Sequence, residues 1–374
     1  VSLITSQASA LPLWLEVLDG NSSDKESFRH TVQAYTRQLE SGTTPWFVMD
    51  SAAYSAENLA AWQETGWVTR VPQTLADVKR IQQGVATDAM TEMSDGYRIF
   101  PLCSTYGDTR QRWLLVYSAQ AHARESRQLD QQVARAADAA EKAWRGLCQT
   151  TFACEADAQA ALEQLAQRLP WHQPEARVVA LKKYARPGRP AKDAVAQIVG
   201  WQLQGHLVTQ EAVIAGARQW LGRFVLATNV LEEERLSHAS LLACYKEQSS
   251  AVERGFRFLK DPLFFADSLF LKSPARIMAM IMIMGLALLI YALAERLLRQ
   301  QLKAHNETLP DQKGKATQSP TLRRVAQMFE GVDLLLIHVD DQLVSRQILN
   351  LTPVRRQILR LLGPEVENCY LVPT

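Results

Sequence analysis

Residues 46–71 read WFVMDSAAYSAENLAAWQETGWVTRV, and this stretch decides the fold class. It begins with an apolar run at 46–49 that ends in the carboxylate of Asp50, which predicts a buried strand. Residues 55–64 predict a helix that a serine caps and a following glycine ends, and residues 67–71 predict a second strand. A strand, a helix and a strand joined by short connections indicate the layering of an α/β protein.

The same alternation extends outward along the chain. A hairpin is predicted at 1–17 and a helix at 27–39, with further strands at 97–106, 113–118, 176–206 and 222–228. Helical spacing predicts helices at 119–147, 156–169, 237–260 and 274–305. Residues 306–320 are polar and rich in turn formers and predict a linker, followed by a helix, a strand and a helix at 320–329, 334–339 and 353–362.

Composition narrows the class of protein. The 374 residues favour about two or three domains. The 41 Lys and Arg against 39 Asp and Glu give a net charge of +2, which excludes a histone-like protein but not local basic faces. The five cysteines form no C-x-x-C pair, so a disulfide framework or a zinc site is not predicted and a reducing cytoplasm fits best.

The apolar run at 277–294, IMAMIMIMGLALLIYALA, holds 18 residues without a charge. This length lies at the threshold for a transmembrane helix. A helix that is apolar all round is buried either in a protein core or in lipid, and hydropathy alone leaves both open.

Two carboxylates are candidates for chemistry. Asp50 follows a predicted strand, and ligands bind at the carboxyl ends of strands in α/β sheets; a simple turn or helix cap would produce the same pattern. Glu253, Arg257 and Lys260 are spaced to share one helix face, which fits a metal ligand beside phosphate-binding cations. An exposed helix with internal ion pairs is the alternative.

A basic stretch at 177–192 contains no acidic residue and one tyrosine, Tyr184. DNA contact and a solvated charged hairpin both fit this pattern. The turn Gly188-Arg189-Pro190 is also similar to minor-groove hooks. Its six cations are Arg177, Lys182, Lys183, Arg186, Arg189 and Lys192.

Residues 245–260, YKEQSSAVERGFRFLK, resemble the Tyr-Arg-Glu-Lys signature of bacterial insertion-sequence transposases, in which six residues separate the Glu from the Lys. Other parts of the chain resemble the remaining motifs of this family of DDE enzymes, in the same order and with similar spacing. These parts are GNSSD at 20–24, MDSAAYSAENL at 49–59, GRP at 188–190 and FVLATN at 224–229.

The chain also departs from the signature. Position 248 is Gln where the family has Arg, and Glu253 follows Tyr245 by eight residues rather than seven. The first catalytic Asp of the family would lie on a strand before the hairpin at 1–17, and no residue here matches it. We therefore expect that the chain lacks an N-terminal part with that Asp and any terminal DNA-binding domain, and that it is inactive as it stands.

The resemblance implies an α/β fold with a ribonuclease-H-like core, interrupted by an α+β insertion domain between the second Asp and the Glu. The domains would be the first part of the core at 1–118, the insertion at 119–221, the second part of the core at 222–305, and a linker and C-terminal region at 306–374. Relatives bury the helix equivalent to 274–305 against the sheet, so we expect a core helix and no membrane span.

The resemblance also assigns roles to the candidate residues. Asp50 and Glu253 would be catalytic and would bind metal, as two of the three carboxylates that hold two Mg²⁺ ions about 4 Å apart. The backbone of the transposon end would be contacted by Tyr245, Arg257 and Lys260, with Arg254 on another face. Lys182, Lys183, Arg186 and Arg189 would contact DNA from the insertion domain.

The implied function is that of a DDE transposase of a bacterial insertion sequence, which cleaves DNA and transfers strands at the transposon ends. Its partners would be the terminal inverted repeats, target DNA and a second copy in a homodimeric synaptic complex, in the bacterial cytoplasm at the nucleoid. Two alternatives stay open. In the first, the chain would be a non-enzymatic membrane-anchored protein with a single span at 277–294. In the second, it would be a relic that binds DNA without cutting it.

Overall fold

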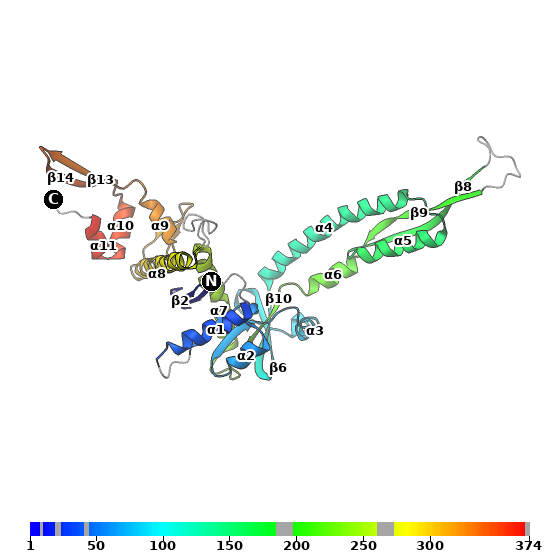
Figure 1. The fold of residues 1–374 in the computed structure, drawn as a ribbon, viewed down its shortest axis with the longest axis horizontal. Helices are drawn as coiled ribbons and strands as arrows, with labels where there is room; N and C mark the ends of the chain where they lie inside the picture. The colour runs from blue at the N-terminus through cyan, green and yellow to red at the C-terminus, as the bar shows by residue number, and fades with distance from the viewer. Residues whose placement is uncertain (8–9, 19–23, 41–44, 185–196, 260–272, 371–374) are drawn as a thin grey trace. The chain divides into compact units, whose positions relative to one another are not determined.

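The computed structural model describes the chain apart from residues 8–9, 19–23, 41–44, 185–196, 260–272 and 371–374. The chain divides into two compact units (Figure 1). Unit 1 comprises Val1–Thr69, Thr105–Gln111 and Thr228–Thr374, and unit 2 comprises Arg70–Ser104 and Arg112–Ala227.

The largest sheet has six strands in the order β3-β4-β10-β7-β6-β5. Strands β3 and β4 are parallel, with Trp46 opposite Gly66, whereas β5 and β6 are antiparallel, so the sheet is mixed. This arrangement confirms the predicted α/β class. The bounds are β3 Trp46–Met49, β4 Gly66–Arg70, β5 Thr91–Glu92, β6 Tyr97–Tyr106, β7 Thr109–Ser118 and β10 Arg223–Thr228.

The β3–β4 connection folds as its sequence predicts. It contains the short helix η1 (Ser51–Ala53) and α2 (Ala56–Ala61). Ser55 caps α2, because its Oγ accepts a hydrogen bond from the backbone N–H of Asn58 at 3.4 Å. The side chain of Asn229, after β10, accepts from the backbone N–H of Trp67 at 3.0 Å and so joins β4 to the end of β10 within unit 1.

Unit 2 also contains a long antiparallel hairpin, β8 (His172–Lys183) and β9 (Gln197–Thr209). The helices α4 (Ala119–Gln149) and α5 (Glu155–Arg168) run alongside it (Figure 1). Trp144, Leu162 and Leu203 form the small core between these elements. The hairpin confirms the strand character predicted at 176–206 for residues 176–183 and 197–206, while residues 185–196 lie outside the described part of the chain.

Two helices of unit 2 were not predicted: α3 (Ala76–Gly84) and α6 (Glu211–Gln219). The end of α3 is tied to β10 by Arg223, whose guanidinium donates to the carbonyl oxygens of Gln82 at 2.7 Å and Val85 at 2.6 Å. Burial lowers the pKa of Arg223 from its ordinary value.

In unit 1 the predicted N-terminal hairpin consists of β1 (Ser2–Thr5) and β2 (Pro12–Glu16), followed by α1 (Asp24–Arg37). The hairpin packs on α7 (His238–Leu259) and α8 (Pro274–Ala304). Its apolar contacts join Leu3 and Leu15 to a cluster of Leu259, Met284 and Leu288.

The apolar run of α8 is not the buried core helix that we expected. Only 17% of its most hydrophobic 18-residue window is buried. The hairpin and α7 cover one face, while Met282, Ile283 and Ile290 on other faces are 60–71% exposed. The helix is long and apolar enough to cross a membrane by length and composition, although a single such helix is weak evidence of a span.

The segment predicted as a linker at 306–320 is partly structured. It forms the small hairpin of β11 (Leu309–Pro310) and β12 (Ala316–Thr317), and Leu309 is buried with Leu298 and Leu302 of α8. The remaining elements are α9 (Leu322–Met328), β13 (Asp333–Val339), β14 (Gln342–Leu349), α10 (Pro353–Leu362) and α11 (Pro364–Tyr370).

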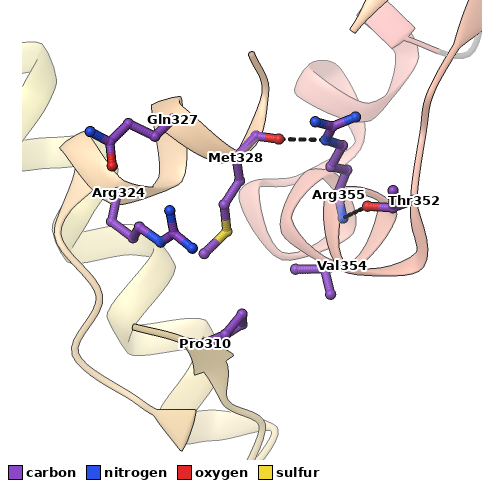
Figure 2. A pocket seen from close by; sticks show the side chains of 7 residues that line it. All are labelled: Pro310, Arg324, Gln327, Met328, Thr352, Val354 and Arg355. Atoms are coloured by element: carbon purple, nitrogen blue, oxygen red, sulfur yellow. Dashed lines mark hydrogen bonds between the residues drawn. The ribbon is translucent and has the colours of Figure 1, made fainter. Parts of the chain in front are cut away.

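A small cavity of about 350 Å³ separates α9 from the start of α10 (Figure 2). Arg355 on its wall donates to the backbone carbonyl oxygens of Met328 and Asn350, and to that of Glu330 at 2.8 Å. Because these donors satisfy three carbonyls, Arg355 has a structural role that fastens α9 and the β13–β14 hairpin to α10.

Candidate active site

Asp50 lies directly after β3, at the carboxyl end of a pair of parallel strands. Its backbone carbonyl accepts a hydrogen bond from Thr69 Oγ1 of β4 at 2.7 Å. Its Oδ1 accepts from the backbone N–H of Ala52 at 2.9 Å and so caps η1. Asp50 is exposed, and a carboxylate has two oxygens, so a cation can bind Oδ2 without breaking the cap.

Glu253 is exposed on α7, the helix that packs against β3 and β1. Gly255, two residues later, faces Leu3, since an added Cβ would lie 2.6 Å from Leu3 Cδ2. Two residues turn a helix by about 200°, so Glu253 is on the face of α7 opposite that contact.

Asp50 directly follows β3 and Glu253 is on α7, and these two elements of unit 1 are in contact. Within the described part of the chain, no three His, Cys, Asp or Glu side chains come together in a group that could hold a metal ion. The donor set does fit a hard cation, because Asp50 and Glu253 offer exposed carboxylate oxygens.

Among the other residues predicted from the signature, the structure describes Tyr245, Arg254 and Arg257. Tyr245 is half-buried on α7, and Arg257 is exposed on the same helix four residues after Glu253, which is one turn. Lys260 lies outside the described residues. Arg254 points to another face, as expected, and forms an ion pair with Glu295 of α8.

The predicted DNA contacts of the insertion domain fall at the end of β8. Lys182 and Lys183 are exposed there, paired in register with Ile198 and Gln197 of β9. Arg186 and Arg189 lie outside the described residues, as does the Gly188-Arg189-Pro190 turn. Lys182 and Lys183 belong to unit 2, whereas Asp50 and Glu253 belong to unit 1.

Sequence reasoning missed a polar network around Glu295. This residue is 6% exposed, and its Oε1 lies 3.0 Å from Arg254 Nη1 and 2.6 Å from Arg299 Nη2. Its Oε2 accepts from the backbone N–H of Leu322 at 2.9 Å. Burial lowers the pKa of Arg299. The signal in the sequence was a carboxylate that follows a long apolar run on the same helix.

Comparison with known proteins identifies a family for the chain. A family model described as "Transposase DDE domain" matches residues 1–290, a range that includes both Asp50 and Glu253. No curated protein and no solved structure matches the chain. The match agrees with the mixed α/β sheet and confirms the predicted ribonuclease-H-like fold class.

Proposed function

The chain belongs to the transposase DDE domain family, and from this premise we propose that its function is DNA cleavage and strand transfer at the ends of a bacterial insertion sequence, in a site that needs a third carboxylate beside Asp50 and Glu253. Family membership makes it a transposase that acts on DNA with divalent metal ions. The observation that carries the finer proposal is that the matched range holds Asp50 at a strand end and Glu253 on the helix packed against that strand.

In this proposal Asp50 and Glu253 bind Mg²⁺. Two Mg²⁺ ions, when bound, supply charge stabilisation at the leaving oxygen and at the attacking water or 3′-hydroxyl. The hydrogen bonds that Asp50 makes to Ala52 and Thr69 fix its backbone and one oxygen, so its free oxygen is held in one direction. Glu253 supplies a second carboxylate from α7.

Cations next to these carboxylates would position the DNA. Arg257 shares the helix face of Glu253. By resemblance to the signature, Arg257, Tyr245 and Lys260 would contact the backbone of the transposon end. Lys182, Lys183, Arg186 and Arg189 would add contacts from the insertion domain, which at residues 119–221 falls wholly within unit 2. Phosphate contacts of this kind set register and make affinity depend on salt.

The proposed partners are the terminal inverted repeats, target DNA and a second copy of the chain, since two transposon ends must be held together. The proposed location is the bacterial cytoplasm, at the nucleoid. The four proposed segments are 1–118, 119–221, 222–305 and 306–374.

A second candidate is a membrane-anchored, non-enzymatic protein, and the exposed apolar surface of α8 favours it. Membrane fractionation after expression separates the two. Recovery of the protein in the soluble fraction without detergent contradicts an anchor, and recovery only with detergent contradicts the first proposal's soluble, DNA-acting protein.

The test of catalysis is the variant pair Asp50→Asn and Glu253→Gln, made in a protein that also supplies the third carboxylate and measured in a Mg²⁺-dependent cleavage assay on DNA that carries the transposon ends. Loss of a residue that merely orients a metal ligand costs roughly 10- to 100-fold, so loss of a ligand should cost more than about 100-fold. Glu26→Gln is the matched control, because Glu26 is an exposed carboxylate on helix α1 of the same unit.

Equal activity of Glu253→Gln and Glu26→Gln would contradict the assignment of Glu253. Because only two of three carboxylates are assigned, we also expect that this chain alone does not cleave. Mg²⁺-dependent product from the chain by itself would overturn that expectation.

A further inference from the structure

Helices α7, α8 and α9 of unit 1 enclose a cavity of about 940 Å³, whose walls are strongly basic. Its acidic residues are Glu247 and Glu295. The cations on its walls are Arg254, Arg257, Arg296, Arg299, Lys303 and Arg323. With six cations and two carboxylates, the lining carries a surplus of positive charge.

The buried carboxylate accounts for two of these cations. Glu295 is paired with Arg254 and Arg299, and it also accepts from the backbone N–H at the start of α9. Tyr291 Oη accepts from the backbone N–H of Arg323 at 2.9 Å. These bonds fix α9 against α8, so the walls of the cavity are built by the fold itself.

Two of the other cations lie in a row along α8. Arg296 and Lys303 are seven residues apart on α8, which is two turns on one face and about 10 Å along the axis. That length corresponds to roughly three nucleotide steps at 3.4 Å per step. The rings of Phe258 and Tyr291, with centroids 5.2 Å apart, line the same cavity and provide an apolar surface between the cations.

We propose that this cavity binds the sugar–phosphate backbone of a DNA strand, with Arg296, Lys303 and Arg323 as phosphate contacts. The inference rests on the proposed function and extends it, because Arg257 on the cavity wall shares a helix face with Glu253. A row of cations spread over about 10 Å suits a repeating phosphodiester better than a single small anion. The proposal also gives a role to Arg296, Lys303 and Arg323, which the signature on α7 does not include.

The test compares two double variants that make the same change of charge. Arg296→Gln with Lys303→Gln neutralises the row, and Gln keeps a good helix propensity. Arg135→Gln with Lys142→Gln is the control, since these exposed cations have the same seven-residue spacing on α4. Binding of a fluorescently labelled duplex is measured by anisotropy over a range of salt concentrations, with thermal melting to check the fold.

We expect the cavity variant to bind DNA at least about tenfold more weakly. The slope of log affinity against log salt should become less steep by about 1.8, because each phosphate contact contributes about 0.9. The control should keep the wild-type slope. If the double variant melts early, Lys303→Gln alone, at an exposed position, should reduce the slope by about 0.9.

Wild-type affinity and slope in the cavity variant, or an equal loss in the control, would overturn the inference. Inorganic tripolyphosphate provides a second contradicting result. If it binds tightly, and the mutations abolish its binding while DNA binding is unchanged, then the cavity binds a free polyphosphate and the inference is wrong. These results are separable from a failure of the proposed function, because the test of catalysis measures cleavage by Asp50→Asn and Glu253→Gln, and neither residue is changed here.

Discussion

Substitution of Glu295 by Gln should destabilise unit 1, because Glu295 joins three of its helices. Its carboxylate lies within 3.0 Å of Arg254 on α7 and Arg299 on α8, and it accepts the backbone N–H of Leu322 at the start of α9. The glutamine keeps the size and one carbonyl oxygen, so the change removes the charge with little change of volume.

The expected loss of unfolding free energy follows from how far the two arginine partners of Glu295 are buried. Removing one member of a fully buried ion pair costs about 3–5 kcal/mol, because the other charge is left uncompensated. Here the Arg254 side chain is 42% exposed and that of Arg299 is 25% exposed, so water stabilises both guanidinium groups in part. The glutamine oxygen also continues to accept one hydrogen bond. We therefore expect a loss of about 2 kcal/mol in the free energy of unfolding, below the range for full burial.

Urea unfolding followed by circular dichroism measures this loss as a lower midpoint with an unchanged slope. Glu64→Gln is the control, since Glu64 is exposed, and its effect should stay within about 0.5 kcal/mol. Combined with Arg254→Met, Glu295→Gln should cost less than the sum of the single changes. A midpoint equal to that of the control, or strict additivity of the pair, would refute the reasoning.

Two further predictions concern backbone strain and pH. Gly222→Ala should destabilise unit 2 by about 2 kcal/mol or more, because Gly222 has φ +72° and an added Cβ would lie 2.6 Å from the backbone N of His122. Thermal melting measures this loss of stability, with Gly216→Ala as the control, because an added Cβ at Gly216 meets open space. Burial raises the pKa of Tyr291 above its ordinary value, so its contribution to stability is present below about pH 10 and is lost as the pH rises through the raised pKa. Tyr291→Phe should remove that part of the alkaline loss in a pH series of urea midpoints, and an unchanged profile would contradict it.

The elements that the sequence predicted well carry their signals locally. The parallel pair β3 and β4 follows from two short apolar runs and a capped helix between them, and Phe47 and Trp67 are buried as expected. Helices α3 and α6 were missed, and both begin without a side-chain cap, at Leu75 and Gln210. Without a capping residue, a helix start has little signature in the sequence.

Burial and long-range networks could not be predicted in the same way. Composition made 277–294 a candidate for the core, but the neighbours of a helix decide which faces are covered, and here α7 and the N-terminal hairpin cover one. Likewise two partners of Glu295 are 41 residues before it and 27 after it, so the local pattern, an apolar run followed by Glu295 and by Arg299 four residues later, reveals only part of the network. The positions of Asp50 and Glu253 on their elements were predictable, whereas the distance between them depends on how α7 packs.

The two interpretations of Asp50, as a cap and as a metal ligand, do not exclude each other in this fold. Oδ1 accepts from Ala52 and the carbonyl is fixed by Thr69, so the structural role orders the side chain through one oxygen only. An ordered carboxylate loses less conformational freedom when it binds a cation, and the cap therefore favours the proposed chemical role. Asparagine at this position keeps an oxygen for the cap while it removes the charge. Asp50→Asn thus separates the two roles, whereas Asp50→Ala would remove both and leave a loss of activity open to a purely structural explanation.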